Sequence, residues 1–230
     1  MSIGRTFEES LLKAIRSLET GVFHLYMEKF DEKTREELLS YIKAGTDDRI
    51  FAVAQLLRLG CNVQQIAFET KIDGFFLEKM KKIIEMENML KANPWNRDVL
   101  HEAKRGGFSD RAVAWLWNTD EDTVFRIRKE MHLFPVYKMI DTCASEFDSY
   151  VPYFYSTYEE ENESIAEDRK KILVLGSGPI RIGQGVEFDY STVHAVKTIR
   201  NAGYEAIVIN NNPETVSTDY TTSDKLYFEP

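Results

Sequence analysis

The spacing of hydrophobic residues changes near Lys171, and this change limits the fold more than any other feature. Before it, apolar residues recur every three or four positions between helix caps, as they do in amphipathic helices. After it, short apolar runs flank one stretch with helical spacing, which is typical of strands buried in a parallel sheet. The sequence therefore predicts an all-α helical domain followed by an α/β lobe.

Two capping boxes mark helix starts in the first part. Thr6 with Glu9, and Thr34 with Glu37, have the spacing at which a hydroxyl accepts a backbone N–H while the carboxylate reaches back. We expect the first helix to stop at Gly21. One apolar stripe is expected along this helix, formed by Phe7, Leu11, Ile15, Leu18 and Val22.

A short pattern in the helical part occurs twice. Gly60 and Gly107 each precede a capping residue, Asn62 or Ser109, and then a short apolar helix. An aspartate-containing turn and a longer helix follow in both places. The pattern predicts two similar helical hairpins that bury one face each.

The second part predicts three strands, at 172–175, 206–209 and 225–228, with a helix at 192–202 between the first two. Three strands and one helix cannot cover both faces of a parallel sheet. We therefore expect an incomplete lobe, and a chain that is a fragment of a longer protein. The acidic run from Glu159 to Asp168 is expected to be a solvated linker.

A glycine-rich turn follows the first predicted strand. Gly176, Gly178, Gly183 and Gly185 would let the backbone approach a ligand, and amides at the next helix start can hold an anion. The turn is not a G-x-G-x-x-G fingerprint, because Arg181 takes the place of the third glycine, and it is not a P-loop. A phosphate or nucleotide cradle and a plain tight turn both remain open.

Three charged residues lie on or beside the C-terminal ends of the predicted strands. They are Arg181, Glu187 and Glu214, the last within the run 210–214 after the second strand. Open α/β sheets bind ligands at this edge. The simpler alternative is that these residues cap loops and form surface salt bridges.

Charge and composition disfavour several classes of partner. A net charge of -9 disfavours nucleic acid, because phosphate binding needs clustered basic residues. No apolar run is long enough to span a bilayer, so no membrane partner is expected. Cys61 and Cys143 lie far apart, which favours a cytoplasmic location. No metal spacing surrounds the histidines, for which structural roles are expected: His24, His101, His132 and His194.

The motifs after Lys171 resemble those of one enzyme family. RIGQGVEFDY at 181–190 and NNNPETVSTDY at 210–220 resemble the start of the second synthetase half of carbamoyl-phosphate synthase large subunits. YKMIDTCASEF and PYFYSTYEEE resemble the segment leading into that half. IGRTFEESLLKAIRSLETG resembles the end of the first half.

The resemblance implies four segments. Residues 1–21 would be the last helix of the first half, 22–158 the helical oligomerisation domain, and 159–170 a linker. Residues 171–230 would start the second Rossmann-like, pre-ATP-grasp lobe, truncated here. In the helical domain, oligomer contacts or core packing are expected for Trp95, Trp115, Trp117, Phe75 and Phe76.

The resemblance also implies an activity for the parent protein. The family is a ligase that makes carbamoyl phosphate from bicarbonate, glutamine-derived ammonia and two ATP, for pyrimidine and arginine biosynthesis. Its partners would be a glutaminase small subunit and other large subunits. ATP and Mg or Mn would bind the parent but not this fragment. No cofactor, metal ligand or catalytic residue is therefore expected here, and the fragment alone is expected to be inactive.

By motif match, Arg181, Glu187 and Glu214 fall where the family lines a passage for carbamate.

A rival interpretation is a small Rossmann-like nucleotide-binding enzyme with a helical N-terminal domain. The missing third glycine counts against it. So do Asn210 and Asn211, which stand where an acidic residue would end the second strand.

Overall fold

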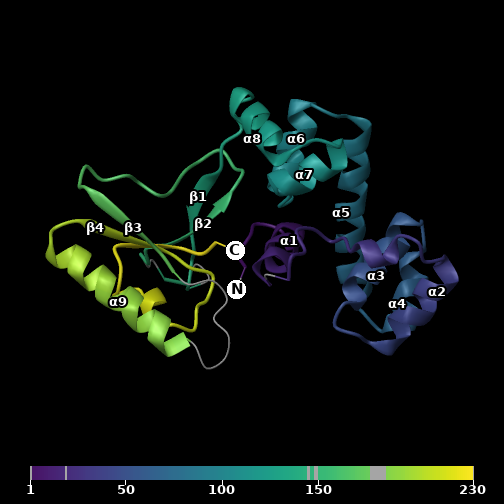
Figure 1. Cartoon of the computed structure of the whole chain (residues 1–230), viewed down its shortest axis with the longest axis horizontal. Coiled ribbons are helices and arrows are strands. Elements are labelled where there is room, and N and C mark those ends of the chain that lie inside the picture. The colour runs from purple at the N-terminus through teal and green to yellow at the C-terminus, as the bar shows by residue number, and fades with distance from the viewer. Residues whose placement is uncertain (1, 19, 144–145, 148–149, 177–184, 230) are drawn as a thin grey trace. The chain divides into compact units, whose positions relative to one another are not determined.

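The structure is a computed structural model that describes residues 2–18, 20–143, 146–147, 150–176 and 185–229. The side chains of 185–188 are outside this description. Two compact units divide the chain (Figure 1). The helical unit holds 6–16 and 20–133, and the sheet unit holds 1–5, 17–19 and 134–230. The predicted fold class, an all-α part followed by a mostly parallel α/β lobe, is confirmed.

The helical unit consists of short helices around one apolar core. In Figure 1, α5 runs through the unit, with α3 and α4 near one end and α6 and α7 near the other. The elements are α1 (Phe7–Ser17), η1 (Glu28–Phe30), α2 (Arg35–Tyr41), η2 (Ile42–Ala44), α3 (Arg49–Arg58), α4 (Val63–Thr70), α5 (Gly74–Ala92), α6 (Arg97–Arg105), α7 (Asp110–Trp117) and α8 (Glu121–Glu130).

The predicted helix caps are present. At Thr34 both halves of the capping box form, because its side chain accepts the Glu37 amide and the Glu37 carboxylate accepts the Thr34 amide. At α1 the Glu9 amide donates to Thr6 Oγ1 at 3.2 Å. Each such bond satisfies an amide that has no partner within its helix.

The internal repeat is visible in the backbone. Gly60 and Gly107 both have positive φ, and each leads into an eight-residue helix, α4 or α7. Both helices end on a left-handed residue that is not glycine, Lys71 in the first copy and Asn118 in the second. The copies differ in their following helices, since α5 has 19 residues and α8 has 10. Side chains cap the helices of both copies: Asn62, Asp73, Ser109 and Asp120.

The predicted stripe of α1 is partly confirmed. Ile15 is buried and Leu11 packs against the core, but the helix ends at Ser17 and Leu18 is exposed. Leu12 is also buried, together with an ion pair between Lys13 and Glu9. Glu9 packs closely against Gly107, where an added Cβ would lie 2.7 Å from the Glu9 Cα.

A buried ionic cluster joins α3, α5 and the segment after α1. Arg58 donates from Nε to Glu87 Oε2 at 2.9 Å and from a terminal nitrogen to Oε1 at 2.6 Å. His24 Nε2 lies 2.9 Å from Glu87 Oε1. Burial alone would raise the pKa of Glu87, but hydrogen bonds from Arg58 and His24 hold that pKa at about 2. The carboxylate is therefore charged, and His24 donates to it from Nε2.

The first prediction concerns His24 and pH. Burial lowers the pKa of His24 below 6.5, although Glu87 opposes this, so the ring binds a proton less readily in the folded chain than in the unfolded chain. The unfolded chain gains a proton as pH falls through about 6.5, and unfolding should become easier by up to about 1.4 kcal/mol per pH unit. The contribution of His24 to the free energy of unfolding is therefore complete above about pH 6.5 and decreases as the pH falls below that value. Urea unfolding between pH 7.5 and 5 (about the titration range of histidine) measures the slope.

The matched variants are His24→Gln, which removes the titrating ring, and His101→Gln on α6 as control. We expect a flatter pH dependence in His24→Gln and an unchanged one in His101→Gln. Identical slopes in wild type and His24→Gln would show that the ring does not titrate with folding.

The sheet unit contains five strands in the order β1-β2-β5-β4-β3. β1 and β2 are antiparallel, and the remaining pairs are parallel. Figure 1 shows α9 along β3 and β4, and its Val196 joins their core. The elements are β1 (Val136–Met139), β2 (Tyr153–Thr157), β3 (Lys171–Leu175), α9 (Gly185–Asn201), β4 (Glu205–Ile209), η3 (Val216–Thr218) and β5 (Lys225–Tyr227).

The three predicted strands are present, but the sheet is larger than expected. β1 and β2 lie within 22–158, which was expected to be helical throughout. They form strands because β2 pairs with β5, with Tyr153 opposite Leu226. β3 was expected to be buried but is an edge strand, and its Leu175 is 73% exposed.

The acidic linker is solvated as predicted, apart from the half-buried Glu159 and Ser164. Two of its residues nevertheless form hydrogen bonds with β1. The Tyr137 amide donates to Asn162 Oδ1, and the Glu163 amide donates to the Tyr137 carbonyl, both at 2.8 Å. The linker therefore continues the hydrogen bonding of β1 while most of its residues stay exposed to solvent.

Candidate functional site

The loops after β3 and β4 meet at the C-terminal edge of the sheet. The Gly176 amide donates to the Ile209 carbonyl at 2.8 Å. A Cβ on Gly176 would lie 2.8 Å from that oxygen and 2.9 Å from Asn210 Cβ, so a larger residue does not fit without movement. Glycine is needed here for close approach of two backbones rather than for positive φ.

The loop after β4 is folded by its own side chains. Asn210 Oδ1 accepts the Asn212 amide at 3.1 Å, and Asn212 Oδ1 accepts the Glu214 amide at 2.9 Å. Thr218 Oγ1 donates to the Thr215 carbonyl at 2.7 Å. Asparagine and threonine side chains fix turns in this way, so the backbone at Glu214 is held although its side chain is exposed.

Helix α9 supplies a second anchor to this loop. Asp189 is 9% exposed, and its carboxylate accepts the Val216 amide at 2.8 Å and the Ser217 amide at 3.1 Å. Sequence reasoning missed Asp189, although it stands two residues after Glu187 in VEFDY. Its partners lie far along the chain, and spacing alone does not reveal them.

Only some of the predicted site residues lie in the described part of the chain. Glu214 lies in the loop after β4, and Gly176 directly follows the last residue of β3. Arg181, Gly178 and Gly183 lie outside the described residues. Gly185 begins α9, and Glu187 belongs to its first turn, with a side chain that is not described. The grouping of Arg181, Glu187 and Glu214 around one passage stays a prediction.

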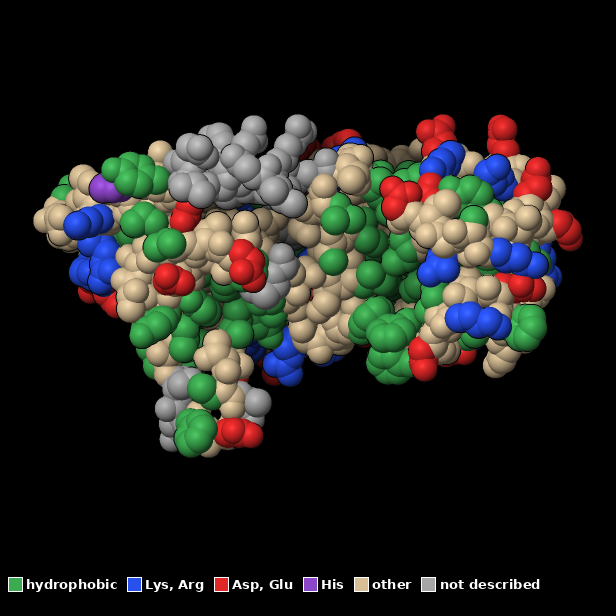
Figure 2. Space-filling view, turned by 90° about the horizontal axis from the view of Figure 1, so that it is seen from below, with side chains coloured by type: hydrophobic (Ala, Val, Ile, Leu, Met, Phe, Trp, Pro, Cys, Tyr) green, Lys and Arg blue, Asp and Glu red, His purple; other side chains and the backbone are tan. Residues whose placement is uncertain are grey.

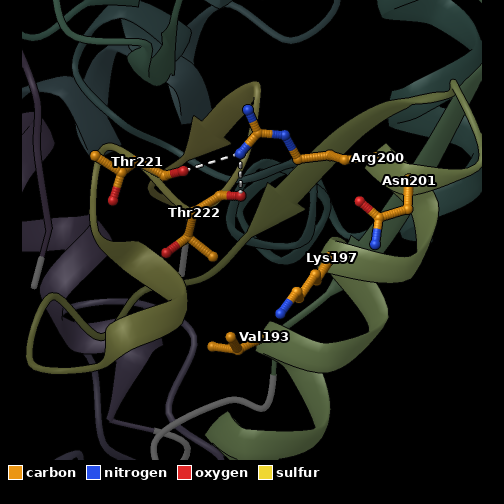
Figure 3. Close-up of a pocket in the computed structure, with 6 residues that line it drawn as sticks. All are labelled: Val193, Lys197, Arg200, Asn201, Thr221 and Thr222. Atoms are coloured by element: carbon orange, nitrogen blue, oxygen red, sulfur yellow. Dashed lines mark hydrogen bonds between the residues drawn. The ribbon is translucent and has the colours of Figure 1, made fainter.

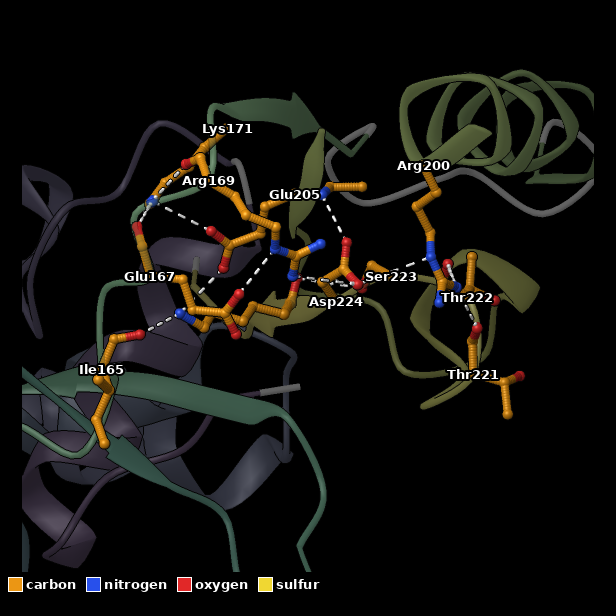
Figure 4. Close-up of polar contacts among 12 residues, drawn as sticks. Ile165, Glu167, Arg169, Lys171, Arg200, Glu205, Thr221, Thr222, Ser223 and Asp224 are labelled. Atoms are coloured by element: carbon orange, nitrogen blue, oxygen red, sulfur yellow. Dashed lines mark hydrogen bonds and ion pairs between the residues drawn. The ribbon is translucent and has the colours of Figure 1, made fainter. Parts of the chain in front are cut away.

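The opposite edge of the sheet carries a buried ionic cluster (Figure 4). Glu205, at the start of β4, has 0% exposure, and Lys225 Nζ and Lys171 Nζ lie 3.1 and 3.2 Å from its two oxygens. Burial alone would raise the pKa of Glu205, but the two lysines lower it. Lys225 also donates to the Ile165 carbonyl, so the cluster ties the linker to β4 and β5.

A pocket of about 390 Å³ lies near this same edge (Figure 3). Its walls come from α9 and the loop before β5: Val193, Lys197, Arg200, Asn201, Thr221 and Thr222. Arg200 donates to the carbonyls of Thr221 and Thr222 at 2.9 Å each, so it joins helix to loop. Ligands of open α/β sheets bind at the C-terminal ends of strands, and we assign none to this pocket.

Buried ionisable groups of the helical unit contact one another. Lys104 Nζ lies 2.8 Å from Asp110, which also accepts from Arg128 at 3.0 Å. Burial lowers the pKa of Lys104 to about 8, although Asp110 opposes this. Opposite charges at these distances are the usual arrangement for structural buried pairs.

The described residues contain neither a clear metal site nor a membrane-spanning helix. No cluster of three or more His, Cys, Asp or Glu side chains suited to a metal ion occurs in that part of the chain. Within the same part, every helix is too short or too polar to cross a bilayer.

Two family models match the chain. The model described as carbamoyl-phosphate synthetase large chain, oligomerisation domain, matches residues 1–132. The model described as carbamoyl phosphate synthase preATP-grasp domain matches residues 168–230. The first match covers more than half of the chain, and the second covers β3, α9, β4 and β5.

The second prediction concerns Glu205. Glu205→Ala leaves the ammonium groups of Lys225 and Lys171 without their carboxylate, and breaking a buried pair costs about 3–5 kcal/mol. The free energy of unfolding of the sheet unit, measured in urea, should fall by that amount. Glu167→Ala is the control, because it removes an exposed partner of Arg169 and should cost about 1 kcal/mol or less. Equal effects of the two variants would contradict a structural role for the cluster.

Proposed function

The chain belongs to the carbamoyl-phosphate synthase large-chain family, and from this we propose that it connects the two synthetase halves of the glutamine-hydrolysing enzyme. The parent enzyme would make carbamoyl phosphate from bicarbonate, glutamine-derived ammonia and two ATP, and would serve pyrimidine and arginine biosynthesis in the cytoplasm. The observation that carries this proposal is the order of the two matched domains on one chain. ATP, Mg or Mn, and the contact with a glutaminase small subunit are assigned to other parts of the parent.

The sheet unit would contribute part of a passage for carbamate. Carbamate breaks down in water, so a route between two active sites must be closed to bulk solvent and lined by fixed polar groups. Glu187 on α9 and Glu214 on the loop after β4 are the proposed lining residues, together with Arg181. Support comes from the hydrogen bonds between α9 and that loop, which join the two glutamate-bearing segments.

The helical unit would support assembly of large subunits. Phe75 and Phe76 are 57% and 44% exposed and form a trio with Phe7, with ring centroids 5.4 to 6.2 Å apart. Trp117 is buried and donates to the Leu90 carbonyl at 2.9 Å, so it belongs to the core. Figure 2 shows hydrophobic side chains between charged ones of both signs on one face of this unit. Exposed aromatic side chains are enriched at protein interfaces, which supports a contact through this trio.

The free-standing nucleotide-binding enzyme is disfavoured by the family assignment. The loop after β4 also carries buried Asn210 and Asn211 in place of an acidic residue that would bind a ribose.

The third prediction tests the passage in the intact large subunit. Glu214→Ala removes one fixed charge from the route but leaves both active sites untouched. Bicarbonate-dependent ATP cleavage and ATP synthesis from carbamoyl phosphate should both survive. Overall synthesis from glutamine should fall by roughly one to two powers of ten, equivalent to about 1.4–2.7 kcal/mol on the limiting step. All three rates are measured on one preparation.

Glu160→Ala is the control, since Glu160 is exposed and lies on the linker. It should leave all three rates unchanged. Equal loss of the three rates in Glu214→Ala would indicate misfolding, and an unchanged overall rate would remove Glu214 from the passage.

The fourth prediction tests assembly of the chain. Replacing Phe75 and Phe76 together by Ser should weaken self-association by at least about tenfold, because exposed aromatic anchors carry much of the binding energy of an interface. Sedimentation equilibrium at tens of micromolar (about the range of weak interfaces) measures the dissociation constant. Phe68→Ser on α4 is the matched control, because Phe68 is exposed but lies outside the trio. A wild-type chain that stays monomeric would reject the proposal.

A further inference from the structure

The 3₁₀ helix η3 begins without a cap of its own. Its first residue, Val216, follows Thr215, whose side chain makes no capping bond. The first amides of a helix have no partner within it and need an outside acceptor. Asp189 provides that acceptor from α9, with Oδ2 2.8 Å from the Val216 nitrogen and Oδ1 3.1 Å from the Ser217 nitrogen.

The bond from Ser217 is protected from water, because Asp189 is 9% exposed and Ser217 is 1% exposed. The bond from Val216 is only partly buried, since Val216 itself is 58% exposed. A charged acceptor makes stronger bonds to amides than a neutral one, and more so where water is excluded. The contact therefore fixes the start of η3 against α9 more firmly than a surface cap would.

The far end of the same loop is attached elsewhere. The Tyr153 hydroxyl on β2 donates to the Thr218 carbonyl at 2.6 Å, and Thr222 Oγ1 donates to the Val216 carbonyl at 2.8 Å. Asp189 thus joins the loop to the helix, while Tyr153 joins it to the sheet. Glu214 stands two residues before Val216, between the asparagine turns and this double attachment.

We propose that Asp189 is a positioning residue that sets the place of Glu214 relative to α9, and hence to Glu187 on the same helix. The inference rests on the proposed carbamate passage and deepens it. An ordinary capping residue would contribute stability alone. A positioning residue also determines whether Glu187 and Glu214 line the same carbamate passage. Its loss should lower overall synthesis while each of the two partial reactions continues.

The first experiment reads the loop directly, without any enzyme assay. Amide hydrogen exchange is measured by NMR on the 230-residue chain for wild type, Asp189→Ala, Asp189→Asn and the control Asp219→Ala, which changes an exposed aspartate after η3. In Asp189→Ala the Val216 and Ser217 amides should exchange at least about tenfold faster, because bonds to a charged acceptor are lost.

The other variants and a second set of amides control for general destabilisation. Asp189→Asn keeps one acceptor oxygen and should give an intermediate rate, and Asp219→Ala should match wild type. The amides of β4 should stay protected in every variant. Unchanged exchange at Val216 and Ser217 in Asp189→Ala, or equal acceleration across β4, would overturn the inference.

The second experiment is a double-mutant cycle in the intact large subunit. Asp189→Ala should lower overall synthesis by about as much as Glu214→Ala, roughly one to two powers of ten, and leave both partial reactions intact. The double variant should be no slower than Glu214→Ala alone, because Asp189 acts through Glu214. Losses that multiply would overturn the inference.

The two experiments separate failure of the inference from failure of the passage. Suppose that Glu214→Ala leaves overall synthesis unchanged while the Val216 and Ser217 amides exchange faster in Asp189→Ala. This result would reject the carbamate passage but would support the role of Asp189 in attaching the loop to α9. Suppose instead that these amides exchange as slowly in Asp189→Ala as in wild type, while Glu214→Ala loses overall synthesis but keeps both partial reactions. This result would reject the role of Asp189 and support the passage.

Discussion

Backbone amides at the ends of short elements need hydrogen-bond acceptors, and the architecture of this chain depends on side chains that supply them. Apart from α5 and α9, the helices described have 11 residues or fewer, so a large share of their amides lie in first turns, where no carbonyl is available. In the helical unit the acceptors stand next to their helices in sequence, as Asn62 and Ser109 do. In the sheet unit one acceptor, Asp189, comes from a different element and so determines tertiary structure as well.

Two buried carboxylates also restrict how the helices and strands can be arranged. Glu87 in the helical unit and Glu205 in the sheet unit each contact two basic or hydrogen-donating side chains from other elements. Removing such a charge from water costs several kcal/mol, and only a fixed set of partners compensates for it. Because a wrong register leaves the charge unpaired, these clusters favour one arrangement of the helices and strands around them.

Features that depend on neighbouring residues could be predicted from the sequence. The caps at Thr34 and Asn62, the repeat that begins at Gly60, and the strands β3, β4 and β5 follow from local spacing. The strand β2 could not be predicted in this way, because its partner β5 lies far along the chain. The burial of Glu9 on α1 was missed for a similar reason, since it packs against Gly107, which lies far along the chain. Near the candidate site, Gly176 and Glu214 follow β3 and β4 as expected, whereas Asp189 was missed. That a ligand binds at this edge, and that Arg181 and Glu187 group with Glu214, stays a prediction.

The strand order has a consequence for synthesis on the ribosome. β2 leaves the ribosome well before β5, which is its parallel partner and lies about 70 residues further along the sequence (a separation that translation at roughly 5–20 residues per second takes seconds to cover). Translation thus leaves the hairpin of β1 and β2 with an unpaired edge for seconds. The strand β2 contains aromatic residues, including Phe154 and Tyr155. An exposed edge strand of this kind can form hydrogen bonds with a strand of another chain, which leads to aggregation. Slow elongation between β2 and β5 would therefore lower the yield of folded protein, and a chaperone that covers aromatic strands would raise it.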